Sequence, residues 1–158
     1  MFFDYDGHAT NASDEKLNEL LNFFNEETEK GKLYISYPMV EALKHIENFD
    51  TFEELKVKCK ENIDYKKVVR QKGLVQLKQI IHYDFQQWKE LIDIHLKKMN
   101  YIANDLFVFP SEIIDQLTIF NKQLEKYVNI NQTVAVLSSF PVFLHDYYGN
   151  EDLKKRIE

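Results

Sequence analysis

Two aspartates near the start of the chain have the spacing of a divalent-metal site. Asp4 and Asp6 directly follow the apolar residues Phe2 and Phe3, with one residue between them. In a β-strand, residues two positions apart point to the same face, so both carboxylates should project together beyond the carboxyl end of the strand. Mg²⁺ is typically held by one or two carboxylates, together with phosphate and water. The spacing therefore predicts a Mg²⁺ site at Asp4 and Asp6, with His8 beside it.

The same pair of aspartates has two further interpretations. In one, Asp4 is a nucleophile and Asp6 a general acid, as in the D-x-D-G string of haloacid dehalogenase-like phosphatases. That family normally has threonine after the glycine, whereas His8 stands here, and a later acidic pair for its metal is hard to place. In the other, the aspartates only cap a turn or the following helix. The residues alone leave all three interpretations open.

The composition indicates a packed, mainly helical domain. With 158 residues, the chain is long enough for one ordinary domain, residues 1–158, and too short for two. A hydrophobic fraction of 44% argues against disorder, and 4 glycines and 3 prolines are too few for the turns of a many-stranded β fold. We therefore expect a mainly helical α/β fold, with a small parallel sheet covered by long C-terminal helices.

Charge and cysteine usage limit the partners and the compartment. The net charge of −6 gives no overall attraction to nucleic acid or to an anionic membrane, so contact with a polyanion requires a local basic patch. Cys59 is the only cysteine, which excludes an internal disulfide and is typical of a reducing cytosol. The chain contains no signal-peptide pattern and no apolar run of membrane-spanning length. We expect a cytoplasmic protein without a membrane partner.

In residues 1–50, apolar runs and helix signals predict strand, helix, strand and helix in that order. The expected elements are a strand at Met1–Tyr5, a loop at Gly7–Ala12, a helix capped by Ser13 and ending near Gly31, a strand at Leu33–Tyr37 and a helix from about Met39 to Ile46. Two strands joined through a helix in so short a span predict a right-handed parallel crossover.

Residues 51–158 have the pattern of a helical part. The expected elements are a short helix opened by the capping box of Thr51 and Glu54, a long helix over 74–102, a short strand at 107–109, a helix over 112–127, and a helix that starts near Phe140 and ends near Gly149. Thr133–Leu137 fits either a buried strand or the first turn of a helix. Tyr83, Phe85 and Trp88 are expected in the core or in a seam between helices.

The order of the first elements resembles the latter part of a Toprim domain of the RloB-like kind, a family found in bacterial restriction and phage-defence loci. The resemblance is carried by the string DYDGHA after the first strand and by YISYPMVEALKH at 34–45, and it covers roughly the first third of the chain. In that family, the D-x-D strand is followed by a strand ending in a serine-x-proline element and by a helix with a glutamate and a histidine. Those positions are Ser36, Pro38, Glu41 and His45 here.

The resemblance implies Mg²⁺-dependent phosphodiester chemistry on nucleic acid, with a role in restriction or phage defence. It makes Asp4 and Asp6 metal ligands and catalytic residues, and Glu41 a further catalytic residue, with Ser36 and His45 as other site candidates. Toprim domains also use a glutamate on an earlier strand as general acid or base, and only Met1 precedes Phe2 here. We therefore expect this chain alone to be inactive, as a part of a longer protein or as a degenerate member of the family.

A basic run supplies the local patch that nucleic acid would need. Its members are Lys66, Lys67, Arg70 and Lys72, with Lys56, Lys58 and Lys60 upstream. The alternative interpretation of this run is a solvated helix face. The alternative function is a non-catalytic one, in which helices over 74–102 and 112–127 form a bundle that binds another subunit or a second copy of the chain. An exposed apolar stripe on those helices would favour it.

Overall fold

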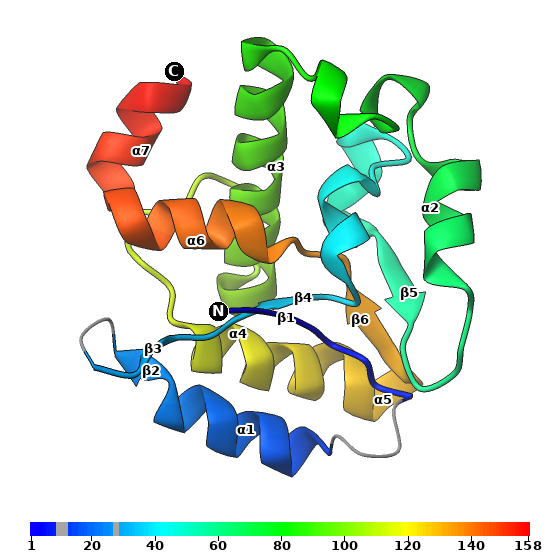
Figure 1. Ribbon diagram of the computed structural model, residues 1–158, viewed down its shortest axis with the longest axis vertical. Helices are drawn as coiled ribbons and strands as arrows, with labels where there is room; N and C mark the ends of the chain where they lie inside the picture. The colour runs from blue at the N-terminus through cyan, green and yellow to red at the C-terminus, as the bar shows by residue number, and fades with distance from the viewer. Residues whose placement is uncertain (9–12, 27–28) are drawn as a thin grey trace.

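The computed structural model describes residues 1–8, 13–26 and 29–158, and the chain is an α/β fold that is mostly helical, as the sequence predicted (Figure 1). The strands are β1 (Phe2–Asp4), β2 (Asn25–Glu26), β3 (Gly31–Lys32), β4 (Tyr34–Ser36), β5 (Lys56–Lys58) and β6 (Thr133–Ala135). The α-helices are α1 (Asp14–Phe23), α2 (Tyr65–Lys72), α3 (Phe85–Asn104), α4 (Gln116–Gln123), α5 (Asn129–Asn131), α6 (Ser139–Tyr148) and α7 (Asn150–Ile157). Short 3₁₀ helices are η1 (Val40–Lys44), η2 (Phe49–Glu54), η3 (Val75–Leu77) and η4 (Ile80–His82), and a π-helical segment, η5 (Leu124–Val128), joins α4 to α5.

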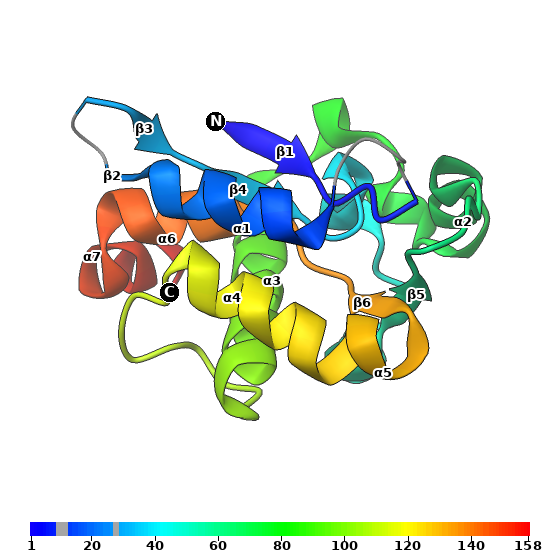
Figure 2. The ribbon, with the colours of Figure 1, turned by 90° about the horizontal axis from the view of Figure 1, so that it is seen from below.

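β1 and β4 form the expected parallel pair, and they place Asp4 directly beside Ser36. The register pairs Phe2 with Tyr34 and Asp4 with Ser36, so the carboxyl ends of both strands meet at one edge. Figure 1 shows the pair running between α6 above and α1 and α4 below, and α1 and α4 also lie side by side when the molecule is seen from below (Figure 2). The prediction of a small parallel sheet covered by C-terminal helices is confirmed.

The helix predicted to end near Gly31 is shorter than expected. Ser13 caps α1 by accepting a hydrogen bond from the Lys16 N–H at 3.2 Å, as predicted, but α1 ends at Phe23. The antiparallel strands β2 and β3 follow, and Gly31 has φ +79°, a left-handed conformation that favours glycine. The chain thus reverses before β4 instead of continuing the helix. Residues 27–28, and residues 9–12 of the predicted loop, lie outside the described residues.

The long helix predicted over 74–102 begins eleven residues later than expected, at Phe85. Asp84 and Gln87 form a reciprocal capping box, with the Gln87 N–H donating to Asp84 at 2.8 Å and the Asp84 N–H donating to Gln87 at 3.0 Å. Upstream, the Leu74 N–H donates to the Ile46 carbonyl at 2.9 Å, which ties this segment to the end of η1. Residues 74–84 therefore form two short 3₁₀ turns, η3 and η4, and the prediction of a helix there was wrong.

Five further expectations about the elements are settled by the structure. The helix expected at Met39–Ile46 is the shorter 3₁₀ helix η1, and residues 107–109 form no strand. The helix expected from Glu112 starts at Gln116, because Asp115 caps it. Thr133–Ala135 is a strand, paired antiparallel with β5, and the helix expected around Phe140 is confirmed as α6.

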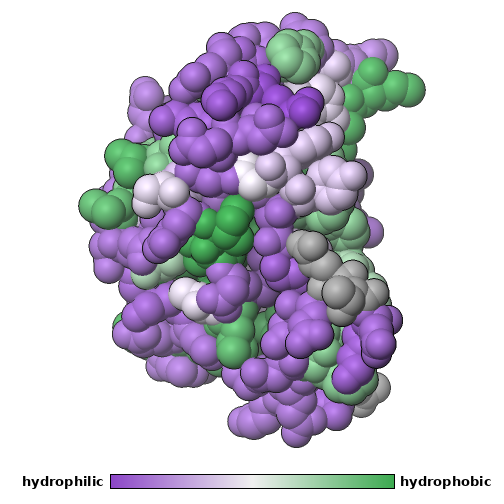
Figure 3. Space-filling model, turned by 90° about the vertical axis from the view of Figure 1, so that its left-hand side faces the viewer, coloured by the Kyte–Doolittle hydropathy of each residue, from purple (hydrophilic) through white to green (hydrophobic). Residues whose placement is uncertain are grey.

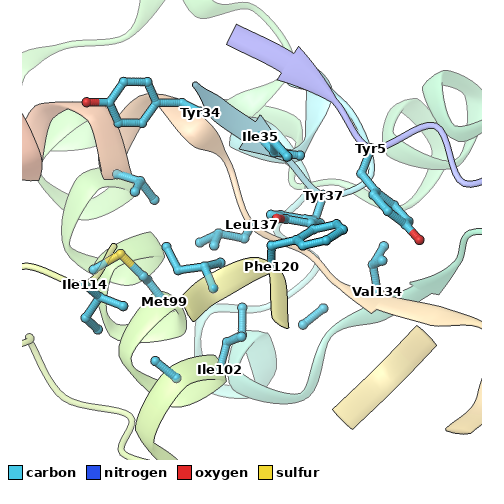
Figure 4. Close-up of a cluster of buried hydrophobic side chains, with 14 of the residues drawn as sticks. Tyr5, Tyr34, Ile35, Tyr37, Met99, Ile102, Ile114, Phe120, Val134 and Leu137 are labelled. Atoms are coloured by element: carbon cyan, nitrogen blue, oxygen red, sulfur yellow. The ribbon is translucent and has the colours of Figure 1, made fainter. Parts of the chain in front are cut away.

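The core joins residues from both parts of the chain. Tyr5, Tyr37 and Phe120 pack together, with 5.7 Å between the ring centroids of the two tyrosines and 6.4 Å between those of Tyr5 and Phe120 (Figure 4). The same cluster contains Leu17 from α1 and Met99 from α3. The sheet of residues 1–50 is therefore buried against helices of residues 51–158.

Cys59, which follows β5, belongs to this core. Its thiol is buried and donates to the Gln132 carbonyl at 3.3 Å. Burial raises the pKa of the thiol to about 11. The cysteine is a packed residue and not an activated one.

Among the described residues, no helix is long and apolar enough to span a lipid bilayer. Figure 3 views the left-hand side of Figure 1, and on this face hydrophilic side chains surround separate hydrophobic patches. The exposed large apolar side chains include Phe2 and Phe3 of β1, and Val75, Ile81 and Phe85 just before and at the start of α3.

Candidate functional site

β1 ends at Asp4, so the two aspartates are not placed by one strand. The Asp6 N–H donates to the Asp4 carbonyl at 3.0 Å, in the turn that follows β1. The Asp6 carboxylate lies 2.6 Å from Nδ1 of His8, and both side chains are exposed. The prediction that both carboxylates share one face assumed a strand through Asp6, but the strand ends at Asp4. Asp6 and His8 pair with one another at the surface, beyond the end of β1.

Glu41, at the start of η1, has a buried carboxylate oxygen. Its Oε2 atom is buried and accepts no hydrogen bond from any described residue, while Oε1 lies 3.7 Å from the ammonium of Lys66 on α2. A buried carboxylate oxygen without a donor costs free energy, which a bound cation would offset. The resemblance to Toprim domains predicted Glu41 as a catalytic residue. In the structure, one oxygen of this carboxylate accepts no hydrogen bond from the described residues.

Glu41 and Asp4 are close enough to influence each other. Burial raises the pKa of the Asp4 carboxyl, the negative charges of Glu41 and Asp6 raise it further, and the Val40 backbone amide and Lys66 oppose them. Two carboxylates that repel each other in a partly buried place favour a cation between them. Lys66, itself largely exposed, lies 3.7 Å from Glu41 and also acts on Asp4.

These two carboxylates suit Mg²⁺ better than a transition metal. No group of three or more His, Cys, Asp or Glu side chains with metal-site geometry occurs in residues 1–8, 13–26 and 29–158. Zn²⁺ requires three or four protein ligands, whereas Mg²⁺ accepts one or two carboxylates and completes its shell with water and phosphate. Together with the unsatisfied Glu41 oxygen, this donor set fits Mg²⁺.

The phosphatase interpretation of Asp4 gains no support from its neighbours. A lysine paired with the Asp4 carboxylate would favour it, but the ion pairs of the described residues include none to Asp4, and Lys66 pairs with Glu41.

Ser36 and His45 have different surroundings. Ser36 is buried next to Asp4, and its Oγ lies 2.7 Å from Oγ of Ser139 and accepts from the Ser139 N–H at 3.2 Å. His45 points the other way: Nδ1 lies 2.8 Å from the Tyr65 hydroxyl and Nε2 lies 3.2 Å from Glu47. Burial lowers the pKa of His45, which favours the neutral ring. Ser36 therefore belongs to the site, and His45 fastens η1 to α2.

The predicted basic run lies on α2, with its four cationic side chains exposed. Lys66 and Lys72 lie near Glu41 and Glu47, at 3.7 and 3.9 Å. In the part of the chain that the structure describes, Lys67 and Arg70 form no ion pair. The contact between Lys66 and Glu41 puts the start of this helix next to the carboxylate pair.

A cavity of about 640 Å³ opens on the other side of Asp4. Its walls are mostly apolar, with Phe2 and Phe3 from β1, Trp88 from α3 and Phe140 from α6. Its polar lining residues are Asp4, Ser36, Ser138 and Ser139.

A backbone bridge assembles this cavity from distant parts of the chain. The Tyr37 and Leu137 backbones exchange hydrogen bonds of 2.8 and 3.0 Å, which carries Ser36 of β4 against Ser139 at the start of α6. His95 of α3 accepts the Ser138 N–H at Nδ1, at 3.2 Å, and so fixes the same turn. The parallel strands, α3 and α6 thus meet at the polar end of the cavity.

Sequence reasoning missed the residues that α3 and α6 contribute. Trp88 was expected in the core or in a seam between helices and is half-buried at the cavity wall, while Phe85, one turn earlier, is 72% exposed. Ser138 and Ser139 carried one usable signal, because two serines before Phe140-Pro141 are typical of a helix start. Nothing in the spacing links them to Asp4, since the contact depends on the bridge between residues 37 and 137.

Comparison with known proteins found no matching family model, no matching curated protein and no matching solved structure.

Proposed function

We propose that Asp4 and Glu41 bind Mg²⁺, and that the protein uses this site for phosphodiester chemistry on nucleic acid, as the resemblance to Toprim domains implies. The observation that carries the proposal is the buried Oε2 atom of Glu41, which accepts no hydrogen bond from the described residues and belongs to a carboxylate whose charge acts on Asp4. Asp6, exposed and engaged with His8, adds negative charge at the rim.

The charges around the site support a phosphate ligand in the presence of metal. Without a cation, Asp4, Glu41 and Asp6 repel an anion. Asp4 and Glu41 would hold Mg²⁺, which would supply charge neutralisation for a phosphate and activation of a water molecule for attack on phosphorus. In this proposal, neighbouring phosphates of the strand would be held by Lys67 and Arg70 of α2, which are exposed and form no ion pair with any described residue.

The metal site is tested by calorimetric titration of Mn²⁺ and Mg²⁺ into the wild type and single variants. Asp4→Asn and Glu41→Gln are each expected to weaken binding at least tenfold, because each removes one of two charged ligands. Asp6→Asn should weaken it less, since its carboxylate is already engaged. Asp50→Asn, which changes an exposed carboxylate on η2, is the matched control and should bind as the wild type does.

If the wild type binds neither cation, or if Asp4→Asn and Glu41→Gln bind as tightly as the control, the proposal is wrong. A positive result is extended with a labelled oligonucleotide, whose affinity should rise when Mg²⁺ is added and fall in Lys67→Gln and Arg70→Gln.

A protein-interaction role is the second candidate function. The predicted bundle helices are largely used inside the molecule, since ten residues of α3 are buried. The exposed apolar residues Val75, Ile81 and Phe85 instead precede or begin α3, and Phe85 and Ile81 are 72% and 87% exposed. This candidate predicts no metal binding at Asp4 and Glu41, so the same titration separates the two functions.

A further inference from the structure

The cavity beside Asp4 has a lining suited to a planar ligand. Its wall residues Phe2, Phe3 and Phe140 are 55%, 46% and 36% exposed, which leaves aromatic surface open to solvent. The Trp88 ring lies with its centroid 5.8 Å from that of Phe140, at an interplanar angle of 64°. Apolar walls with a few convergent polar groups are typical of sites for small planar molecules. The aromatic rings offer the stacking surfaces that nucleobases use.

The Ser36 and Ser139 pair at the polar end of the cavity can donate one further hydrogen bond. Only one of the Ser36 and Ser139 hydroxyls can donate across the 2.7 Å contact between them, and Ser36 Oγ also accepts from the Ser139 N–H. Whichever serine donates, the other hydroxyl hydrogen has no acceptor among the hydrogen bonds of the described residues. This hydrogen can be donated to a ring nitrogen or a carbonyl oxygen of a ligand.

The charge of the surroundings restricts where a phosphate can lie. Asp4 lines the cavity and Glu41 and Asp6 act on it from outside, so the cavity itself disfavours an anion. The uncharged base of a nucleotide is compatible with the cavity, while its phosphate is compatible only with the cation proposed between Asp4 and Glu41. Asp4 belongs both to the cavity lining and to the proposed cation site. A nucleotide could therefore place its base in the cavity and its neighbouring phosphate at the cation.

We infer that the cavity binds an unpaired nucleobase, stacked on one of the exposed aromatic rings of its wall and hydrogen-bonded by the Ser36 and Ser139 pair, so that the nucleic acid recognised is single-stranded at this point. The inference rests on the proposed function, since the metal site supplies the adjoining phosphate contact. A base in a duplex is stacked and paired, and it must leave the helix to enter such a cavity.

Trp88 provides a direct readout, because it is the only tryptophan of the chain. Its fluorescence is followed while a short single-stranded oligonucleotide is added in the presence of Ca²⁺, in place of Mg²⁺, to limit cleavage. Two comparison ligands carry the same phosphates: the strand with abasic sites, and the strand annealed in a blunt duplex. The base-bearing strand is expected to quench Trp88 and to bind roughly tenfold more tightly than either, in keeping with the worth of one stacked base.

Variants separate the cavity from the metal site. Phe3→Leu combined with Phe140→Leu keeps the walls apolar but removes stacking surface, and it should weaken the base-bearing strand at least fivefold without changing cation affinity. Phe23→Leu, at an exposed phenylalanine outside the cavity, should leave both unchanged.

The possible failures are distinct. Equal affinity for base-bearing and abasic strands, or equal affinity of the double variant and Phe23→Leu, overturns the nucleobase inference while cation binding by Asp4 and Glu41 still stands. Absence of cation binding in the wild type overturns the proposed function itself, and the inference with it.

Discussion

His95 shows how one buried side chain can fix the local structure on which the site depends. Its Nε2 atom donates to the Leu43 carbonyl at 3.2 Å, and Nδ1 accepts the Ser138 N–H at 3.2 Å. The neutral ring satisfies both contacts, whereas a protonated ring would turn a second donor toward the Ser138 N–H. Burial lowers the pKa of His95 to about 4.

The low pKa of His95 should make the stability of the protein depend on pH. The pKa is about 4 in the folded chain and 6.5 in the ordinary reference, so the unfolded chain binds more protons between these values. The free energy of unfolding should therefore fall as the pH falls from 6.5 to 4, and His95 should contribute about 3 kcal/mol to that loss. Urea denaturation at a series of pH values measures it.

Variants isolate this contribution from that of the other histidines. His95→Gln should be less stable at pH 7 and should lose less free energy on acidification than the wild type. His82→Gln, at an exposed histidine, should follow the wild-type curve. Parallel curves for His95→Gln and the wild type would contradict the assignment.

At the scale of the elements, Gln123 connects the end of α4 to β6. Its side chain donates to the Ala135 carbonyl at 2.8 Å and accepts the Ala135 N–H at 2.9 Å, while Gln123 itself is only 1% exposed. The amide thus occupies the edge of β6 that β5 does not pair. A helix residue replaces the neighbouring strand that this edge would otherwise need.

We expect Gln123→Leu to lower the free energy of unfolding by about 2 to 4 kcal/mol, because it leaves a buried donor and a buried acceptor of Ala135 unpaired. Gln71→Leu is the matched control: this glutamine is exposed on α2, and its replacement should change stability by less than about 0.5 kcal/mol. Chemical denaturation of the three proteins measures both effects. A loss in Gln123→Leu no larger than that of the control would show that the edge of β6 needs no partner.

Local signals in the sequence account for the elements that were predicted and for those that were missed. The parallel pair β1 and β4 followed from two apolar runs with a helix between them. The wrong start of α3 came from apolar spacing over 74–84, although the capping box of Asp84 and Gln87 was present in the sequence and marks the true start. The apolar spacing upstream of Asp84 resembles a helix, but the capping box marks where the helix begins.

The candidate site was also predicted only in part. Asp4 was predicted from its spacing with Asp6, and Glu41 from the resemblance carried by the string at 34–45. In the structure, the charge of Glu41 acts on Asp4, and its Oε2 atom accepts no hydrogen bond from the described residues. The cavity could not be predicted, since its walls come from residues 2 to 140 and are brought together by the bridge between Tyr37 and Leu137. Pairings across a hundred residues leave no periodic trace in a single sequence.

At the scale of the whole molecule, the two parts of the chain share one hydrophobic cluster. Tyr5, Leu21 and Ile35 from residues 1–50 are buried together with Leu96 and Phe120 from residues 51–158. Removal of residues 1–50 would expose this apolar surface to water, at a cost of about 25 cal/mol per Å².

We therefore expect a fragment of residues 51–158 to lack a cooperative thermal transition, even though it contains most of the helices. Circular dichroism with heating compares it with the full chain in the same buffer. A transition as sharp as that of the full chain would show that the second part folds by itself, and that the shared cluster is dispensable.

The thiol of Cys59 gives the molecule an internal reporter of opening. A sulfhydryl that is shielded from solvent and reluctant to ionise reacts slowly with disulfide reagents such as Ellman's reagent. Separation of β5 from the turn before β6 would expose the sulfur, because the thiol donates to the Gln132 carbonyl in that turn. The labelling rate of this single cysteine, measured in native buffer, should thus follow the frequency with which the antiparallel pair comes apart.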